Sequence, residues 1–176
     1  EIRPDFWQAW YDKAELAVET GKIPEAVAAL RKVTQHNPKH WRSWLELGGL
    51  LGDLGDEKEA LRCYARAAEL NPDSWEAWRA LGHEYFSLKR YNDAARALAR
   101  ATKLNSRDAA LWLEAAECYY ITGNPNLAVK AVEMSLRLKE TPQAWLSKGI
   151  ASITMGDKQA ALEAFKTGIA LDPASP

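Results

Sequence analysis

The chain repeats itself at a step of 34 residues, and no other feature limits its possible folds as strongly. Five residues of the stretch 41–74 return one step later: Trp44 as Trp78, Gly48 as Gly82, Ala60 as Ala94, Ala67 as Ala101 and Leu70 as Leu104. Four have counterparts one step earlier: Trp41 in Trp7, Trp44 in Trp10, Ala60 in Ala26 and Pro72 in Pro38. A period of this length is typical of helix–turn–helix arrays, in which each unit buries its apolar face by stacking on its neighbours. The sequence therefore predicts a stacked helical array.

Each repeat is predicted to consist of two helices joined by a turn. In the first repeat apolar residues follow helical spacing over 7–17. Gly21 then provides the positive φ that ends a helix, and Pro24 fits the first turn of the next one. In the second repeat Asp56 and Glu59 are expected to form a capping box at the start of the second helix.

The later repeats depart from this pattern at particular places. Lys89 stands where the turn glycine is expected. One residue is missing between Leu138 and Trp145, and because the deletion lies in a loop we expect it to cost little stability. Lys13 and Lys148 replace apolar residues, which is typical of end repeats that lack one neighbour.

The order of Trp, Leu-Gly, small Ala, aromatic, Ala and Pro along each repeat resembles the tetratricopeptide repeat (TPR) family. The resemblance implies an all-α, right-handed α-solenoid of five helix-turn-helix repeats. Residues 1–6 would form a lead-in and 7–176 a single domain, with repeats at 7–40, 41–74, 75–108, 109–141 and 142–174. Ser106 departs from the family pattern, which has proline there.

Small residues recur in register and are interpreted as the points where the two helices of a repeat cross. Gly48, Gly82 and Gly149 on first helices match alanines on second helices, namely Ala26, Ala60, Ala94, Ala128 and Ala161. Two helices approach closely only where no large side chain separates them. We therefore expect each glycine to face an alanine.

Composition argues against several classes of function. The net charge of −1 implies no general attraction to nucleic acid or membrane, and no apolar run is long enough to span a membrane. Cys63 and Cys118 are too far apart in sequence for a metal or disulfide pattern, and the three histidines lack ligand-spaced partners. We predict a protein that is not an enzyme and that needs no cofactor and no metal.

The ends of the chain suggest two further expectations. The first residue is Glu and no signal-peptide pattern follows it, so we expect a piece of a longer or processed protein with a cytoplasmic location. We also expect the last helix, 158–171, to be partly bare, because no further helix is predicted after it. Such an apolar patch favours stacking on another molecule.

The first helices carry the candidate site. In the TPR family these helices line a concave groove, and the helical wheel places the same residues opposite the Trp/Leu/Gly/Tyr stripe. The predicted groove residues are Tyr11, Asp12, Glu15, Arg42, Leu45, Glu46, Gly49, Asp53, Glu76, Arg79, His83, Phe86, Leu113, Glu114, Glu117 and Tyr120. The same face also includes Gly52 and, on the first helix of the fifth repeat, Gln143, Leu146, Ser147, Ile150 and Ile153.

This face is acidic, whereas the second helices are basic. It carries eight acids against Arg42 and Arg79: Asp12, Glu15, Glu19, Glu46, Asp53, Glu76, Glu114 and Glu117. Acids here would repel both nucleic acid and the acidic tails that some TPR domains hold. We therefore predict a non-catalytic module that binds a protein segment with basic and apolar residues.

Other interpretations stay open on the sequence alone. The acidic face could be a solvated surface without a ligand. The chain could instead be a structural unit that self-associates through its last helix, or a regulatory domain of a larger protein. Gly49 and Gly52 could bare a recess beside Leu45 and Phe86, or could reflect packing within the chain.

Overall fold

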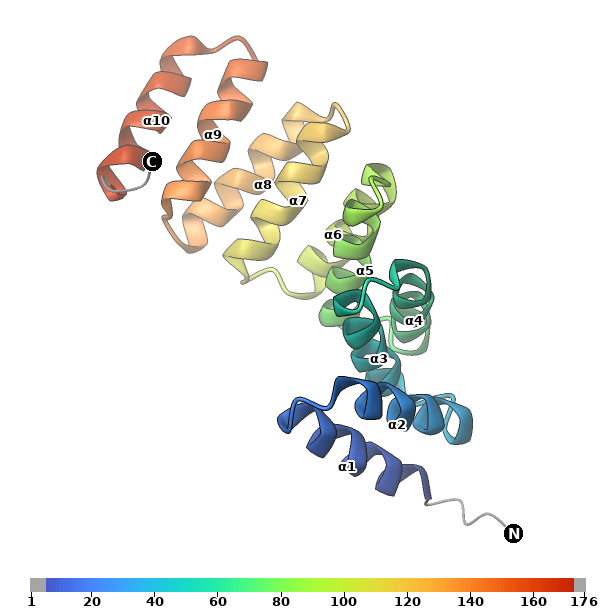
Figure 1. Cartoon of the computed structure of the whole chain (residues 1–176). Coiled ribbons are helices and arrows are strands. Elements are labelled where there is room, and N and C mark those ends of the chain that lie inside the picture. The colour runs from blue at the N-terminus through green and yellow to red at the C-terminus, as the bar shows by residue number, and fades with distance from the viewer. Residues whose placement is uncertain (1–5, 173–176) are drawn as a thin grey trace. The chain divides into compact units, whose positions relative to one another are not determined.

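The computed structural model describes residues 6–172, and over that range it contains ten α-helices and no strand (Figure 1). The all-α prediction is confirmed. Most of the lead-in and the last residues of the fifth repeat lie outside the described range. The helices are Phe6–Glu19 (α1), Ile23–His36 (α2), Trp41–Asp53 (α3), Glu57–Leu70 (α4), Trp75–Ser87 (α5), Tyr91–Leu104 (α6), Ala109–Ile121 (α7), Pro125–Leu138 (α8), Pro142–Thr154 (α9) and Lys158–Leu171 (α10).

The chain divides into two compact units, residues 1–88 with α1 to α5 and residues 89–176 with α6 to α10. In the first unit each helix packs on the next one, and α3 also contacts α5. In the second unit each helix again packs on the next, and α7 also contacts α9. Contacts between near neighbours along the chain are what a repeat array requires. The expectation of one domain over 7–176 stays a prediction.

The predicted turns are present. Gly21, Gly55, Gly123 and Gly156 all have positive φ, from +70° to +82°. Lys89 adopts the same left-handed conformation, with φ of +59°, although it has a side chain. This conformation brings Cβ too close to the neighbouring backbone and costs a residue other than glycine about 1 kcal/mol. The turn geometry is therefore kept where its usual residue is missing.

Helix caps follow the prediction only in part. The Asp56 side chain accepts a hydrogen bond from the Glu59 backbone N–H at 3.2 Å, as expected. In a full box the Asp56 backbone N–H would donate to Glu59, but it donates to the Leu51 carbonyl at 2.9 Å. The Glu59 carboxylate accepts a hydrogen bond from Arg31 on α2 at 2.6 Å. The box is thus one-sided, and Glu59 joins α4 to α2.

No helix within residues 6–172 is long and apolar enough to cross a membrane.

A tryptophan hydrogen bond connects the second, third and fourth repeats to the loops before them. The indole Nε1 donates to the carbonyl six residues upstream three times: Trp44 to Pro38 at 3.0 Å, Trp78 to Pro72 at 2.9 Å and Trp112 to Ser106 at 3.0 Å. The bond at Ser106 shows why proline is dispensable there, since the acceptor is a backbone carbonyl.

Trp145 lacks this bond. Its Nε1 is buried and finds no hydrogen-bond partner among residues 6–172. The loop before it is the one shortened by a residue, and it brings no carbonyl to the indole. A buried donor without a partner costs about 1–3 kcal/mol. That the deletion costs little stability stays a prediction, and the unpartnered indole next to it argues for a larger cost.

The helix-crossing interpretation also needs a correction. Ala26, Ala60 and Ala94 are fully buried, as expected. A Cβ added at Gly48, however, would lie 2.8 Å from the ring of Tyr64 on α4, and one at Gly149 would lie 2.3–2.7 Å from the ring of Phe165 on α10. An aromatic ring, rather than an alanine, therefore excludes any side chain at these two positions.

We predict that Trp145→Phe destabilises the protein less than Trp112→Phe does. Both changes remove the same atoms from a partly buried indole. Trp112→Phe removes a hydrogen bond, whereas Trp145→Phe removes a buried N–H donor that has no partner. The difference in unfolding free energy should be about 1–2 kcal/mol by urea denaturation. Equal losses would show that the Trp145 indole is satisfied in solution.

We predict that Lys89→Gly raises the free energy of unfolding by about 1 kcal/mol, because glycine adopts positive φ without the Cβ clash. The reciprocal change Gly55→Lys, in a turn with φ of +81°, should lower it by a similar amount. Thermal denaturation of both variants measures the pair. A Lys89→Gly variant less stable than the parent would contradict the inference that the Lys89 backbone is strained.

Candidate functional site

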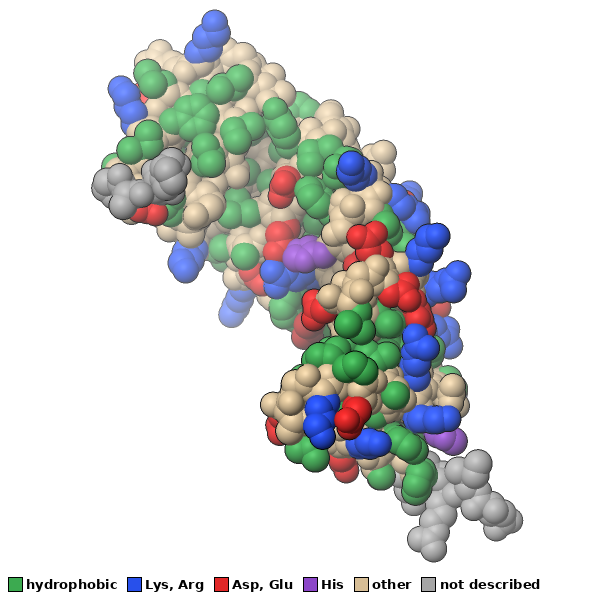
Figure 2. All heavy atoms as spheres, viewed as in Figure 1, with side chains coloured by type: hydrophobic (Ala, Val, Ile, Leu, Met, Phe, Trp, Pro, Cys, Tyr) green, Lys and Arg blue, Asp and Glu red, His purple; other side chains and the backbone are tan. Residues whose placement is uncertain are grey.

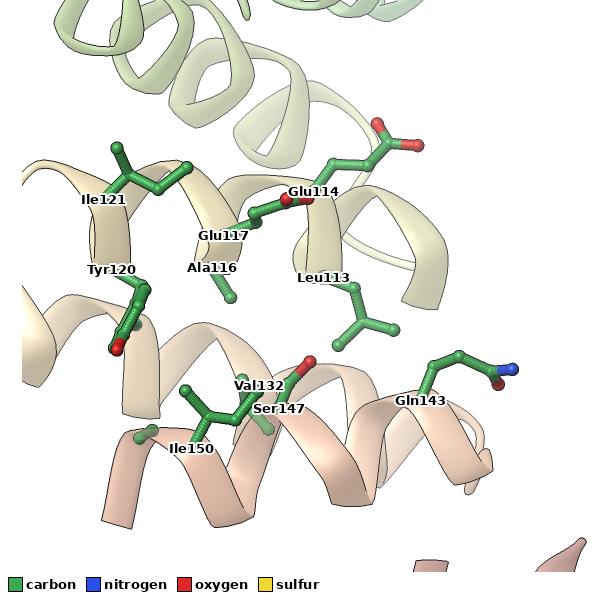
Figure 3. A pocket seen from close by; sticks show the side chains of 12 residues that line it. Leu113, Glu114, Ala116, Glu117, Tyr120, Ile121, Val132, Gln143, Ser147 and Ile150 are labelled. Carbon is green, nitrogen blue, oxygen red and sulfur yellow. The ribbon is translucent and has the colours of Figure 1, made fainter. Parts of the chain in front are cut away.

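A cleft lies in the second unit, where α7, α8 and α9 surround a volume of about 490 Å³ (Figure 3). Its lining includes four predicted groove residues of α7: Leu113, Glu114, Glu117 and Tyr120. On α9 the lining includes Gln143, Ser147 and Ile150, which the helical wheel placed on the same face. The structure adds Ala151 of α9 and Ala128 and Val132 of α8. The lining is completed by Ala116 and Ile121 of α7.

The cleft is apolar inside and acidic at its edge. Leu113, Ala116 and Tyr120 point from α7 toward α9, while Glu114 points away from α9 (Figure 3). Tyr120 and Ile150 remain 44% and 38% exposed, so their apolar surface is open to a ligand. A volume of this size, apolar with a few polar groups, falls in the usual range of binding pockets.

Part of this lining was not anticipated from the sequence. Ala116, Ala128 and Val132 are buried residues on the core stripes of their helices. Their side chains are small or branched, and the packing of α7, α8 and α9 leaves a space over them. That spacing is a property of the packed helices and has no signature in one helix.

In the first unit the predicted residues of α1 and α3 bind each other. The Tyr11 hydroxyl donates a hydrogen bond to Glu46 Oε1 at 2.5 Å. Burial raises the pKa of Tyr11 above its usual value, and the bond to Glu46 raises it further. Burial also raises the pKa of Glu46, partly offset by the Tyr11 bond. The hydroxyl of Tyr11, a predicted groove residue, thus connects α1 to α3.

The other predicted residues of the first unit are spread over its helices. Asp12, Glu15, Arg42 and Asp53 are exposed on α1 and α3. Leu45, Gly49 and Phe86 are partly buried. Glu76, Arg79 and His83 line a shallow hollow of about 270 Å³ on α5, together with Trp75 and Ala80.

His40 has a structural role at the start of α3. Its ring packs against Trp7 and Tyr11 of α1, with centroids 4.9 and 5.2 Å apart. Its Nδ1 lies 2.8 Å from Ser43 Oγ. Burial, followed by the nearby Arg42 charge, lowers the pKa of His40. Within residues 6–172 no three His, Cys, Asp or Glu side chains are grouped as metal ligands.

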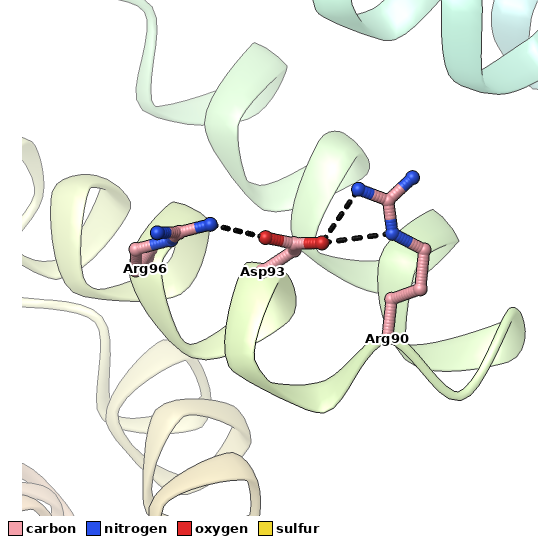
Figure 4. Close-up of polar contacts among 3 residues, drawn as sticks. All are labelled: Arg90, Asp93 and Arg96. Atoms are coloured by element: carbon pink, nitrogen blue, oxygen red, sulfur yellow. Dashed lines mark hydrogen bonds and ion pairs between the residues drawn. The ribbon is translucent and has the colours of Figure 1, made fainter.

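The second helices carry basic residues whose partners are acids of the same surface. Arg31 on α2 pairs with Glu59 on α4 at 2.6 Å. Asp93 on α6 lies between Arg90, at 2.6 Å, and Arg96 (Figure 4). Hydrogen bonds from Arg90 and then Arg96 lower the pKa of Asp93. Lys and Arg side chains gather over α4 in Figure 2, and hydrophobic ones over α9 and α10.

Three glycines of α3 differ in what surrounds them. Gly48 has no room for a side chain, because the Tyr64 ring would lie 2.8 Å from it. A Cβ at Gly49 would meet only Tyr64 Oη, at 3.8 Å. At Gly52 the nearest atoms, at 3.8–3.9 Å, are Glu84 Oε2, Tyr64 Oη and a methyl group. Alanine would therefore fit at Gly49 and Gly52 without a clash.

Helices that contact only their near neighbours define a helical-repeat protein whose first helices carry the candidate site. Sequence profiles described as tetratricopeptide repeat match residues 17–84, 79–142 and 142–175. The chain belongs to the tetratricopeptide repeat family, as its sequence resemblance indicated.

Solved structures agree with this assignment. A crystal structure of MamA protein is 25% identical with a TM-score of 0.88, over 96% of this chain and 93% of that one. MamA 41-end from Desulfovibrio magneticus RS-1 is 19% identical with a TM-score of 0.85, over 97% of each chain. YrrB, described as a TPR protein with an unusual peptide-binding site, is 18% identical with a TM-score of 0.87, over 94% and 86%. No curated protein sequence matches the chain.

We predict opposite effects of alanine at adjacent glycines of α3. Gly49→Ala and Gly52→Ala should each raise the free energy of unfolding by about 1 kcal/mol, because helix propensity improves without a clash. Gly48→Ala should lower it by about 1–3 kcal/mol, because the Tyr64 ring must move. Chemical denaturation measures all three. A loss of stability at Gly52 equal to that at Gly48 would contradict the open space beside Gly52.

Proposed function

We infer that the chain is a non-catalytic interaction module that binds a protein segment rich in apolar and basic residues. The supporting observation is the open apolar cleft between α7 and α9, edged by acidic residues. Family membership supports an interaction role, since TPR proteins are typically scaffolds without enzymatic activity. The description of YrrB names a peptide-binding site in that protein.

The apolar part of the proposed ligand follows from the cleft lining. Leu113, Tyr120 and Ile150 present partly exposed surface on two facing helices. Aliphatic side chains of a bound segment would remove this surface from water, at about 25 cal/mol for each square ångström. A fully polar ligand would leave the interior of the cleft without a matching partner.

The basic part follows from the charges of the first helices. The only charged residues on α7 are Glu114 and Glu117, and Glu117 is exposed at the cleft. In the first unit Glu15, Asp53 and Glu76 are exposed on the corresponding helices. Acids gathered on one face attract basic segments and speed their association at low salt.

We predict that Glu117→Lys weakens binding of a labelled 12-residue Lys/Leu peptide about fivefold at low salt, since an exposed ion pair contributes up to about 1 kcal/mol. Glu133→Lys on α8 is the matched control, because it changes the charge equally at an exposed residue outside the cleft lining. Fluorescence anisotropy measures both. Equal weakening by the two variants, or tight binding of a Glu/Leu peptide, would refute the acidic cleft as the binding face.

A second proposed function is self-association through α10. Leu162 and Ile169 on this helix are 54% and 66% exposed. Beside Ile169 lies a hollow of about 240 Å³, lined also by Leu146 and Phe165. Large apolar side chains grouped on one face are typical of contact surfaces between proteins.

We predict that the chain forms dimers or larger species as its concentration rises, and that Leu162→Lys with Ile169→Lys shifts it to the monomer. The lysines place charge on the surface that the second molecule would bury. Analytical ultracentrifugation over a concentration series tests this. A parent chain that stays monomeric throughout would rule out the α10 contact.

A further inference from the structure

A glutamate lies where the repeat pattern has an apolar residue. Glu84 on α5 is only 8% exposed, and among residues 6–172 its Oε1 atom finds no hydrogen-bond partner. One repeat step earlier the position holds Leu50, and one step later it holds Cys118. A carboxylate oxygen that is buried without a partner is costly, since it loses its hydration and gains no bond in return. A leucine at this position would stabilise the fold more than the glutamate does.

Two glycines of α3, Gly49 and Gly52, could hold a side chain without a clash; the Glu84 carboxylate lies beside Gly52, and the Tyr64 hydroxyl lies beside both. A Cβ at Gly52 would stand 3.8 Å from both Glu84 Oε2 and Tyr64 Oη, and one at Gly49 would stand 3.8 Å from Tyr64 Oη. Both glycines are partly exposed. Larger residues at these two places would cover the carboxylate and the phenol. We call this group, Gly49, Gly52, Tyr64 and Glu84, the Glu84 recess.

The electrostatics of the recess are those of a place for a cation. Burial raises the pKa of Glu84, and the negative charge of Glu57 raises it further. Burial, then the charges of Glu84 and Asp53, raise the pKa of Tyr64 to about 12. The neighbours that shift these two groups are thus all acidic or neutral. A cation entering the recess would meet negative charge in a partly dehydrated setting, where attraction is stronger than in water.

Three features that each lower stability therefore coincide in one place. A glycine inside a helix costs about 1 kcal/mol relative to alanine, and α3 has two that a Cβ would not crowd. The buried carboxylate adds its own desolvation cost. Local choices that oppose the fold and gather at one point are characteristic of functional sites.

We propose that the Glu84 recess receives one cationic side chain, a lysine ammonium or an arginine guanidinium, from a protein segment lying along α3. This inference rests on the proposed function, because it gives the basic residue of the ligand a defined partner. The glycines admit the side chain, the Glu84 carboxylate accepts its hydrogen bonds, and the Tyr64 oxygen provides a second acceptor. Glu84 is then a specificity-determining residue of the first unit.

The first test uses the cation alone. n-Butylammonium is titrated into the full chain, with n-butanol as its neutral counterpart, and the amide NMR signals of Gly49 and Gly52 are followed. We expect saturable shifts with n-butylammonium only, and at least tenfold weaker binding in Glu84→Gln. Glu57→Gln is the matched control, since it removes an exposed carboxylate nearby and should weaken binding less than threefold. Equal binding by Glu84→Gln and the parent would overturn the proposal.

A second variant keeps the proposal testable if Glu84→Gln folds poorly. Gly52→Leu leaves the carboxylate in place and fills the entrance, so it should abolish the n-butylammonium shifts with helix content unchanged by circular dichroism. Glu84→Leu should melt at a higher temperature than the parent and lose the same shifts. Persistence of saturable shifts in folded Gly52→Leu or Glu84→Leu would place the cation elsewhere and refute the recess.

The Lys/Leu peptide separates this inference from the proposed function. Weaker peptide binding by both Glu84→Gln and Glu117→Lys supports both. A peptide that depends on Glu117 but binds Glu84→Gln as tightly as the parent refutes the recess and leaves the cleft standing. A peptide that does not bind, while n-butylammonium still does so through Glu84, supports the recess as a cation site and refutes the proposed groove ligand.

Discussion

Close contact between the two helices of a repeat sets the spacing of the helices and the surfaces between them. It is reached in two ways within this chain. In α3/α4 and α9/α10 the first helix has a glycine, so that an aromatic ring, Tyr64 or Phe165, can lie against its backbone. In α1/α2 a small residue suffices, and Ala26 on α2 is fully buried. Because interiors are packed to crystal-like density, each such contact fixes the spacing of the helices, and with it the surfaces left for ligands.

The two units offer different chemistry on equivalent helices. In the second unit α7 has two charged residues only, so the space toward α9 is apolar and its acids lie at the edge. In the first unit polar groups lie between the helices, with Tyr11 bonded to Glu46 and Glu84 buried beside Tyr64. The repeat therefore supplies a common frame, and substitutions at a few of its positions decide what each surface can bind.

Stability is uneven along this frame, and the uneven places have identifiable causes. Lys89 holds a glycine conformation, the Trp145 indole lacks the acceptor that Trp44 and Trp112 have, and Glu84 occupies a position that is apolar in the neighbouring repeats. The first two follow from a substitution and from a deletion in turns. Glu84 differs, because the helix geometry around it is regular and only the side chain opposes the packing.

The periodic part of this protein can be predicted from its residues: the helices of residues 6–172, the glycine turns and the buried alanines all follow from residues that recur at a fixed step. Local chemistry specifies such features, because turns and helix faces depend on near neighbours. Which atoms meet across helices depends instead on how the helices pack. The Tyr11–Glu46 bond, the ring against Gly48, the space over Ala116 and the unpartnered carboxylate of Glu84 all depend on the distance and rotation between packed helices. A linear pattern carries no record of that geometry, since one face of a helix can pack at several crossing angles.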